Sequence, residues 1–201
     1  MKVGDVPGRG WTLRPVCGIL LEKGAGKMVL WLGHGDAYEL LAAMLGAEYG
    51  LSALPPVERD ENGKPFFPEA PHIHFNLSHS GGLALCGTGD APLGVDVEEL
   101  RPRRPGLARH VLSGREYAWF QQQGGDLVAF YTLWTLKEAR VKCTGRGLRQ
   151  APRTIAVPLL SPGEAGELDG LVFRAYSGET WRAAACCRAG EAPPREIVRI
   201  S

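Results

Sequence analysis

Residues 72–98, HIHFNLSHSGGLALCGTGDAPLGVDVE, decide the fold because they hold three short strands in close succession. The first strand is expected at His72–Leu77, where apolar and polar residues alternate, and the second at Leu83–Cys86. Gly81 and Gly82 lie in the turn between them, and Gly94–Glu98 forms the third strand. The stretch therefore predicts a mainly antiparallel sheet.

Helices and further strands surround this stretch. Capping residues mark the expected helices, which are residues 36–49 begun by Asp36, a helix from Ser113 with Glu116 completing a capping box, and residues 126–143 begun by Asp126 and ended by Gly145. Further strands are expected at Trp11–Leu20, Met28–Leu32, Thr154–Leu160, Leu171–Tyr176, Thr180–Arg188 and Glu196–Ile200. This order of elements predicts an α+β fold.

Composition excludes several classes of function. The 201 residues are 44% hydrophobic, with 23 Lys and Arg against 22 Asp and Glu, so the net charge gives no support to nucleic-acid binding. The first residues are not expected to form a signal peptide, and the sequence has no apolar run of the roughly 20 residues that span a bilayer. Five scattered cysteines without zinc-ligand spacing favour a reduced, cytoplasmic protein.

Two carboxylates in the third strand are the first candidates for chemistry. Side chains alternate along a strand, so Asp96 and Glu98 point to one side and Val95 and Val97 to the other. Two like charges on one face repel each other unless a cation lies between them. The alternative interpretation is an edge strand that faces solvent.

A third carboxylate lies on the long predicted helix. At about 100° per residue, Glu138 falls within an apolar face that includes Phe130, Trp134 and Val141. The alternative is a glutamate at the helix margin, neutralised by Lys142 one turn later. If Glu138 joins the two strand carboxylates, three hard oxygen donors would suit Mg²⁺ or Mn²⁺ better than zinc, together with substrate phosphates.

The segment 75–80 is a candidate for phosphate binding. Ser78, His79 and nearby backbone N–H groups lie where a strand enters a turn, and such groups can receive a phosphate. The alternative is a polar turn with a structural histidine. A serine hydrolase is not indicated, because the sequence lacks the G-x-S-x-G motif.

Taken in order, three blocks resemble the signature motifs of the 4′-phosphopantetheinyl transferase superfamily, and the length resembles its single-chain, Sfp-type members. The blocks are residues 75–80 (FNLSHS), 94–98 (GVDVE) and 134–139 (WTLKEA). Three shorter segments are also similar to the family's pattern, namely Gly63-Lys64-Pro65, Ser113–Tyr117 and Gly145–Leu148. The resemblance implies two similar α+β halves related by a pseudo-two-fold axis, here residues 1–93 and 94–201, in a monomer.

The same resemblance implies an activity and a set of roles. The enzyme would transfer the phosphopantetheine arm of coenzyme A to a serine of an acyl, peptidyl or polyketide carrier protein and release 3′,5′-ADP. Asp96, Glu98 and Glu138 would bind Mg²⁺, or alternatively Mn²⁺, and Glu138 would take the serine proton. The residues implied in binding coenzyme A are Lys64, Pro65, Ser78, His79 and Lys142, of which His79 and Lys142 would also assist catalysis.

The N-terminal third departs from the family pattern. Glu39 stands in the helix where the family often has arginine, and residues 29–34 contain no Lys or Arg. One alternative is therefore a carrier-protein-binding module with weakened catalysis, and another is an unrelated metal-dependent phosphoryl-transfer enzyme. The arginine-rich loop 101–105 follows the strand of Asp96 directly and is expected either to dock an acidic carrier protein or to be a solvated basic loop.

Overall fold

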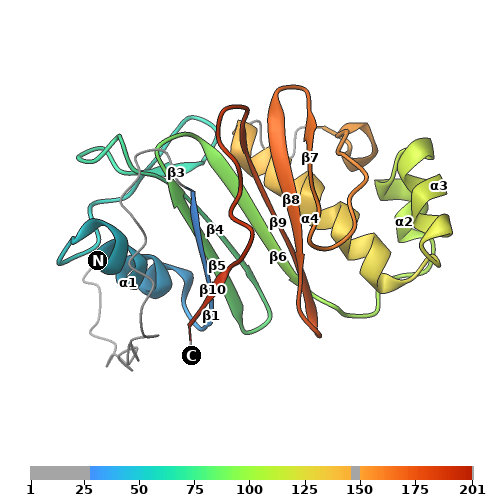
Figure 1. Cartoon of the computed structure of the whole chain (residues 1–201), viewed down its shortest axis with the longest axis horizontal. Coiled ribbons are helices and arrows are strands. Elements are labelled where there is room, and N and C mark those ends of the chain that lie inside the picture. The colour runs from blue at the N-terminus through green and yellow to red at the C-terminus, as the bar shows by residue number, and fades with distance from the viewer. Residues whose placement is uncertain (1–27, 146–149, 201) are drawn as a thin grey trace.

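The computed structural model describes residues 28–145 and 150–200 and arranges them in four layers, helix, sheet, sheet and helix (Figure 1). The first sheet contains, in spatial order, β10 (Val198–Arg199), β1 (Val29–His34), β5 (Leu83–Gly89) and β4 (His74–Ser80). The second contains β6 (Leu93–Glu99), β9 (Trp181–Arg188), β8 (Leu171–Ser177) and β7 (Ala165–Leu168). All neighbours in the sheets are antiparallel except β1 and β10, so the predicted α+β, mainly antiparallel fold is confirmed.

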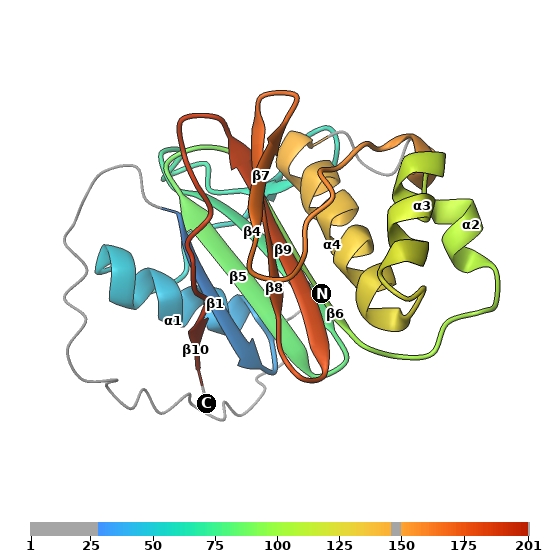
Figure 2. The ribbon, with the colours of Figure 1, turned by 45° about the vertical axis from the view of Figure 1, so that its right-hand side comes forward.

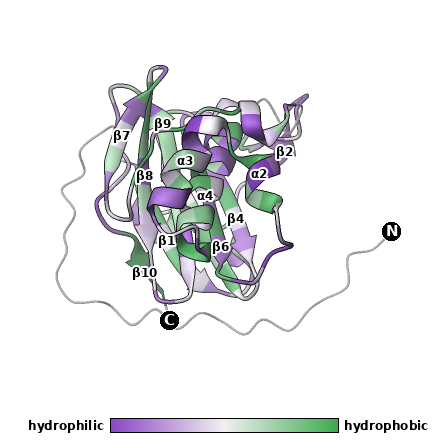
Figure 3. Ribbon diagram, turned by 90° about the vertical axis from the view of Figure 1, so that its right-hand side faces the viewer, coloured by the Kyte–Doolittle hydropathy of each residue, from purple (hydrophilic) through white to green (hydrophobic). Residues whose placement is uncertain are grey.

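Each four-stranded sheet is covered by one long helix. Helix α1 (Ala37–Tyr49) packs on the first sheet, and α4 (Leu127–Thr144) packs on the second (Figure 2). The remaining elements are a small hairpin of β2 (Glu58–Arg59) and β3 (Pro65–Phe66), helices α2 (Leu107–Val111) and α3 (Gly114–Gln122), and the 3₁₀ turn η1 (Pro152–Thr154). In Figure 3, α2 and α3 lie outside α4 and carry hydrophilic residues on their outer surface. Among the described residues, no helix has the length and apolar character that a membrane crossing requires.

The capping residues begin and end the helices as the sequence predicts. Asp36 accepts hydrogen bonds from the backbone N–H groups of Tyr38 and Glu39 at the start of α1. The Asp126 side chain accepts one from the Ala129 N–H at the start of α4, and Gly145 ends that helix with a left-handed φ of 66°. The capping box of α3, from Ser113 and Glu116, is also confirmed.

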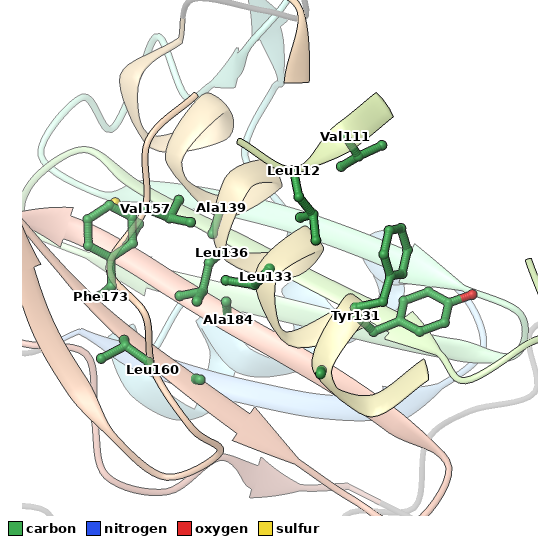
Figure 4. Packing of buried hydrophobic residues seen from close by; sticks show 14 of the residues in the cluster. Val111, Leu112, Tyr131, Leu133, Leu136, Ala139, Val157, Leu160, Phe173 and Ala184 are labelled. Atoms are coloured by element: carbon green, nitrogen blue, oxygen red, sulfur yellow. The ribbon is translucent and has the colours of Figure 1, made fainter. Parts of the chain in front are cut away.

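Strand β6 separates two hydrophobic cores. Val95 and Val97 point into a core between the two sheets, together with Leu30 and Leu85 from the first sheet. Residues on the other face of β6 point toward α4, whose buried side chains meet Phe173, Ala175 and Ala184 of the second sheet (Figure 4). The alternation predicted for the strand therefore directs its carboxylates to the α4 side.

Helix α4 approaches β6 very closely at Gly94. A Cβ atom added there would lie 2.1 Å from the Ala139 carbonyl oxygen and 2.3 Å from the Cys143 nitrogen. These neighbours are backbone atoms of a packed helix, which cannot move aside cheaply. Glycine at this position therefore lets the helix lie directly against the strand that carries the carboxylates.

The two sheets are joined along β4 and β6 by side chains of β4. The Asn76 Oδ1 accepts a hydrogen bond from the Val95 N–H at 2.8 Å. Ser78 and Ser80 repeat the pattern, because their hydroxyl oxygens accept from the N–H groups of Val97 and Glu99 at 3.2 Å. The two strands therefore run parallel, with three polar side chains replacing the backbone ladder that a continuous sheet would have.

Several sequence predictions differ from the described structure or are not tested by it. Residues 154–160 do not form the predicted strand, because η1 is followed by a segment that pairs with no neighbour among the described residues. The short strand β7 was not predicted, and the expected strand Trp11–Leu20 lies outside the described residues. The division at residues 93 and 94 and the pseudo-two-fold axis remain predictions, although β10 returns from the second half to pair with β1.

Candidate active site

Three side chains of α4 face the carboxylates of β6 in a line along the helix. Trp134, Glu138 and Lys142 are spaced four residues apart, so they lie one above the other on one side of the helix. The Trp134 Nε1 donates a hydrogen bond to the Glu98 Oε1 at 3.1 Å, and the Lys142 Nζ donates one to the Asp96 Oδ1 at 2.8 Å. Glu138 lies between these two contacts.

Asp96 is the buried member of the group, with 5% of its surface exposed. Its Oδ1 accepts hydrogen bonds from the Ser78 hydroxyl and the Lys142 ammonium, both at 2.8 Å. Its Oδ2 is buried and has no hydrogen-bond partner among the described residues. Burial raises the pKa of Asp96 above its usual value, and Lys142 and Ser78 oppose that rise.

Glu98 is held by donors from three elements. The Ser80 hydroxyl of β4 donates to its Oε2 at 2.8 Å, and Trp134 of α4 binds Oε1. The third partner is Arg103, in the loop after β6, whose Nη2 lies 3.4 Å from Oε2. These contacts fix the carboxylate in one orientation beside α4.

Glu138 is half-buried and belongs electrostatically to the same group. Burial is the main cause that raises its pKa, and the negative charges of Asp96 and Glu98 add to the rise while Lys142 opposes it. Its surroundings differ from the predicted apolar face, because α4 is buried on most sides and Glu138 shares its own side with Trp134 and Lys142. Lys142 also forms an ion pair with Asp96 rather than neutralising Glu138 alone.

The carboxylates fit a divalent cation in donor chemistry, although they are not preassembled around one. Among the described residues, no three His, Cys, Asp or Glu side chains are arranged as a complete metal site. The unpartnered Asp96 Oδ2 nevertheless offers a buried, hard oxygen, and Glu138 and Glu98 are close enough to influence its charge. Mutual repulsion of these groups is the kind of cost that a bound cation relieves.

A cavity of about 610 Å³ lies at the Lys142 end of this group, and none of the three carboxylates lines its wall. Its wall includes His79 from β4, Lys142 from α4, and Lys64 and Pro65 from the β2–β3 hairpin. The N-terminus of α1 forms another part of the wall. A second cavity of about 1000 Å³ shares Lys64 and Pro65, but it includes neither His79 nor Lys142, so the smaller one is the better candidate for a substrate phosphate.

Two predicted binding residues have their polar atoms engaged inside the protein. The Lys64 ammonium donates to the carbonyl oxygens of Leu93, at the start of β6, and of Lys142 and Cys143, at the end of α4. The Ser78 hydroxyl donates to Asp96. Both residues therefore hold the site together in this structure, whereas His79 is exposed on the cavity wall.

Sequence reasoning missed several residues of the site. Arg59 lines the smaller cavity, with its Nη1 held on the Gly63 carbonyl at 2.8 Å, and only the hairpin brings it there. Lys137, beside Glu138 in the sequence, is fully buried and pairs with Glu116 at 2.8 Å. The capping box with Ser113 identifies Glu116 in the sequence, but nothing in the sequence pattern indicates that Glu116 pairs with Lys137.

Comparison with known proteins agrees with this geometry. The family model described as the 4′-phosphopantetheinyl transferase superfamily matches residues 92–185, which include β6 and α4. A 4′-phosphopantetheinyl transferase of Bacillus subtilis is 33% identical over 140 residues, covering 69% of this chain and 58% of the relative. This chain belongs to the 4′-phosphopantetheinyl transferase superfamily.

Other relatives in the superfamily match similar shares of this chain and of their own length. The 4′-phosphopantetheinyl transferase Sfp of Bacillus subtilis strain 168 is 31% identical over 148 residues, covering 70% of this chain and 66% of the relative. The 4′-phosphopantetheinyl transferase AcpT of Salmonella typhimurium is 39% identical over 110 residues, covering 52% and 57%. The chain thus matches between about half and two thirds of the length of these curated relatives.

Proposed function

We propose that this protein transfers the 4′-phosphopantetheine arm of coenzyme A to a serine of an apo carrier protein. The observation that carries the proposal is the buried Asp96, whose Oδ2 is unpartnered among the described residues, close to the charges of Glu98 and Glu138. Lys142, which donates a hydrogen bond to Asp96, lines the smaller cavity. Membership of the superfamily and the names of the relatives point to the same reaction.

In the proposed reaction Glu138 acts as the base. Its raised pKa makes it a better proton acceptor than an ordinary glutamate, provided that it is ionised at the working pH. The acceptor serine oxygen forms a bond to the β-phosphorus of coenzyme A, the serine proton goes to Glu138, and the bond from that phosphorus to the bridging oxygen breaks. The bridging oxygen leaves as part of 3′,5′-ADP.

The other residues bind and orient the substrate. Asp96, Glu98 and Glu138 would hold Mg²⁺ or Mn²⁺, and when bound this ion supplies charge stabilisation for the diphosphate. Lys142 supplies a further positive charge beside Asp96, and His79 and Arg59 lie on the cavity wall where phosphate groups would enter. We assign Ser78 to orienting Asp96. Lys64 and Pro65 would fix the cavity wall. These three residues would therefore act on coenzyme A indirectly, by shaping the site that binds it.

The partner proposed for the loop after β6 is an acidic carrier protein. Arg104 is exposed there, and Arg109 lies over the Tyr117 ring, with its guanidinium carbon 5.2 Å from the ring centre. A positive surface beside the active site would attract an acidic partner. The protein is proposed to act as a monomer in the cytoplasm.

The direct test is mass spectrometry of several apo carrier proteins after incubation with this protein, coenzyme A and Mg²⁺. Addition of one phosphopantetheine group to the acceptor serine is expected, and chelation of the divalent cation should stop it. A carrier protein whose acceptor serine is replaced by alanine serves as the control. Absence of transfer to every carrier tested would contradict the proposal.

A weakened carrier-binding module is the second candidate, because the Asp36 carboxylate caps α1 at the cavity and residues 29–34 contain no Lys or Arg. Titration with coenzyme A in the presence and absence of Mg²⁺ separates the two functions. The transferase requires saturable binding that the cation strengthens. A module without coenzyme A affinity would still bind the carrier protein.

A further inference from the structure

Arg103 connects the loop after β6 to a candidate metal ligand. Its Nη2 lies 3.4 Å from the Glu98 Oε2, and its Nε donates a hydrogen bond to the Tyr131 hydroxyl at 2.5 Å. The Arg103 side chain is 41% exposed and that of Glu98 is 20% exposed. The contact is therefore at the outer edge of the site, where a docking partner can reach the arginine.

Tyr131 ties the position of the loop to the position of this arginine. The tyrosine is fully buried in α4, and its hydroxyl donates to the Arg101 carbonyl oxygen at 3.0 Å. The same hydroxyl accepts from Arg103, whose guanidinium carbon lies 5.0 Å from the ring centre. A displacement of the loop therefore disturbs the Arg103–Glu98 contact directly.

The neighbouring arginines do not share this contact among the described residues. Arg101 pairs with Glu99, which points away from α4 toward the Gly82 backbone. Arg104 is exposed on the same loop. Ser80 and Trp134, the other donors to Glu98, are neutral, so Arg103 is the positive charge that this carboxylate meets in the described structure.

A guanidinium and a divalent cation cannot both approach one carboxylate without repelling each other. The repulsion is considerable at separations of a few ångströms, because the edge of the site is only partly screened by water. We propose that Arg103 is a positioning residue that opposes cation binding at Glu98 until an acidic carrier protein, docked on the loop, draws it away. This inference rests on the proposed function, because it requires a cation site at Glu98.

The arrangement makes carrier docking and cation binding reciprocal. If an acidic partner removes Arg103 from Glu98 and so strengthens cation binding, the cation must strengthen partner binding by the same factor. The site would then gain its cation preferentially when the acceptor is present. Hydrolysis of coenzyme A by stray water would be reduced as a consequence.

The test measures Mn²⁺ binding by titration calorimetry and by the electron paramagnetic resonance of the free ion, without any turnover. Four proteins are compared, namely the wild type and the variants Arg103→Gln, Arg103→Lys and Arg104→Gln. Arg103→Gln should bind Mn²⁺ about three- to tenfold more tightly, because a competing charge is gone. Arg103→Lys keeps the charge and should stay near wild type, and Arg104→Gln should change the affinity less than twofold.

A second arm adds a saturating apo acyl carrier protein whose acceptor serine is replaced by alanine. The carrier should tighten Mn²⁺ binding to the wild type by a similar factor and leave Arg103→Gln unchanged. Circular dichroism and melting curves establish that each variant is folded. If Arg103→Gln fails to fold, the carrier effect on the wild type still decides the coupling.

Each result has a distinct meaning. Absence of Mn²⁺ binding to the wild type, with and without coenzyme A, would overturn both the metal site of the proposed function and this inference. Normal Mn²⁺ binding that is unchanged or weakened in Arg103→Gln would overturn the role of Arg103 alone. A wild-type affinity that does not respond to the carrier protein would overturn the coupling.

Discussion

The two four-stranded sheets of the molecule are each covered by one long helix, but the two helices differ in what they bury. Helix α1 buries the apolar residues Leu40, Leu41, Met44 and Leu45 against the first sheet. Helix α4 buries Lys137 completely and half-buries Glu138 and Lys142. The two lysines have matching groups, since Lys137 pairs with Glu116 and Lys142 with Asp96, whereas Glu138 makes no ion pair among the described residues.

This difference shows how the fold accommodates reactive groups. A buried charge destabilises a protein unless it is paired and hydrogen-bonded, so a site made of several charges needs a dedicated set of partners. The second half supplies those partners around α4, whereas β4 of the first half contributes neutral side chains, Asn76, Ser78 and Ser80. The first half thus orients the carboxylates without adding further charge to them.

The largest effect is expected at Glu138. Glu138→Gln keeps the shape of the side chain but removes the proton acceptor and one negative charge, so transfer should fall by about 10²- to 10⁴-fold. The rate of carrier modification under single-turnover conditions measures this. Glu48→Gln, on the corresponding helix α1, is the matched control and should leave the rate within about twofold. Comparable losses in both variants would remove the functional distinction between the helices.

The close approach of α4 to β6 predicts a large effect of Gly94→Ala. The new methyl group would overlap backbone atoms of Ala139 and Cys143, so the helix must shift, at a cost of about 1–3 kcal/mol or more. Chemical denaturation and the transfer rate should both report the shift. Gly114→Ala in α3 has open space around the new atom and should be neutral or slightly stabilising. Equal stability of the two variants would contradict the packing argument.

The side-chain ladder between the sheets predicts a moderate effect of Asn76→Ala. The variant leaves the buried Val95 N–H without its acceptor, which should lower the free energy of unfolding by about 1–3 kcal/mol. Urea denaturation measures the loss. Ser52→Ala, at an exposed position in the connector, is the control and should change little. A negligible effect at Asn76 would show that the hydrophobic core between the sheets suffices to hold the halves together.

The raised pKa of Glu138 predicts a smaller effect on stability that depends on pH. In the unfolded chain this carboxyl ionises near its ordinary value, whereas in the folded protein it ionises at a higher pH, so the folded state loses stability as pH rises through that interval. Glu138→Gln should therefore melt at the same or a higher temperature near neutral pH. Its advantage should shrink as pH falls to the ordinary glutamate value. An advantage that grows on acidification would contradict this direction.

The smallest effect is expected from the exposed docking charges. Replacing Arg104 and Arg109 together by alanine should lower kcat/KM for an acidic carrier protein about threefold at low salt, because electrostatic attraction is lost. The difference should disappear at high ionic strength, where exposed charges are screened. Coenzyme A affinity, measured in parallel, should not change. A loss of that affinity would instead place these arginines in the nucleotide site.

Local signals in the sequence predicted most of this structure. The capping residues Asp36, Ser113 and Asp126 act within a few positions of themselves, and the alternation along β6 placed Asp96 and Glu98 on one face. These features depend on neighbouring residues, so a single sequence is sufficient to find them. The confirmed superfamily membership likewise rests on contiguous motifs.

Features that depend on distant packing could not be predicted. The helical wheel of α4 assumed one buried side, but the sheet, α3 and the loop after β6 together bury most of its surface. Ser78 was predicted to lie in a phosphate-binding turn, and only the neighbouring β6 shows that Ser78, with Asn76 and Ser80, joins two strands. Residues 154–160 have an apolar pattern suited to a strand but pair with no strand among the described residues.

The parallel pairing of β10 with β1 has a consequence for the order of folding. These strands come from opposite ends of the described chain, and β10 follows β9, which belongs to the other sheet. The edge of the first sheet therefore stays open until the chain has passed through the second sheet and returned, and closing so long a loop is slow. Until then no other described strand covers this edge of β1, where another chain could pair, so this interval favours aggregation.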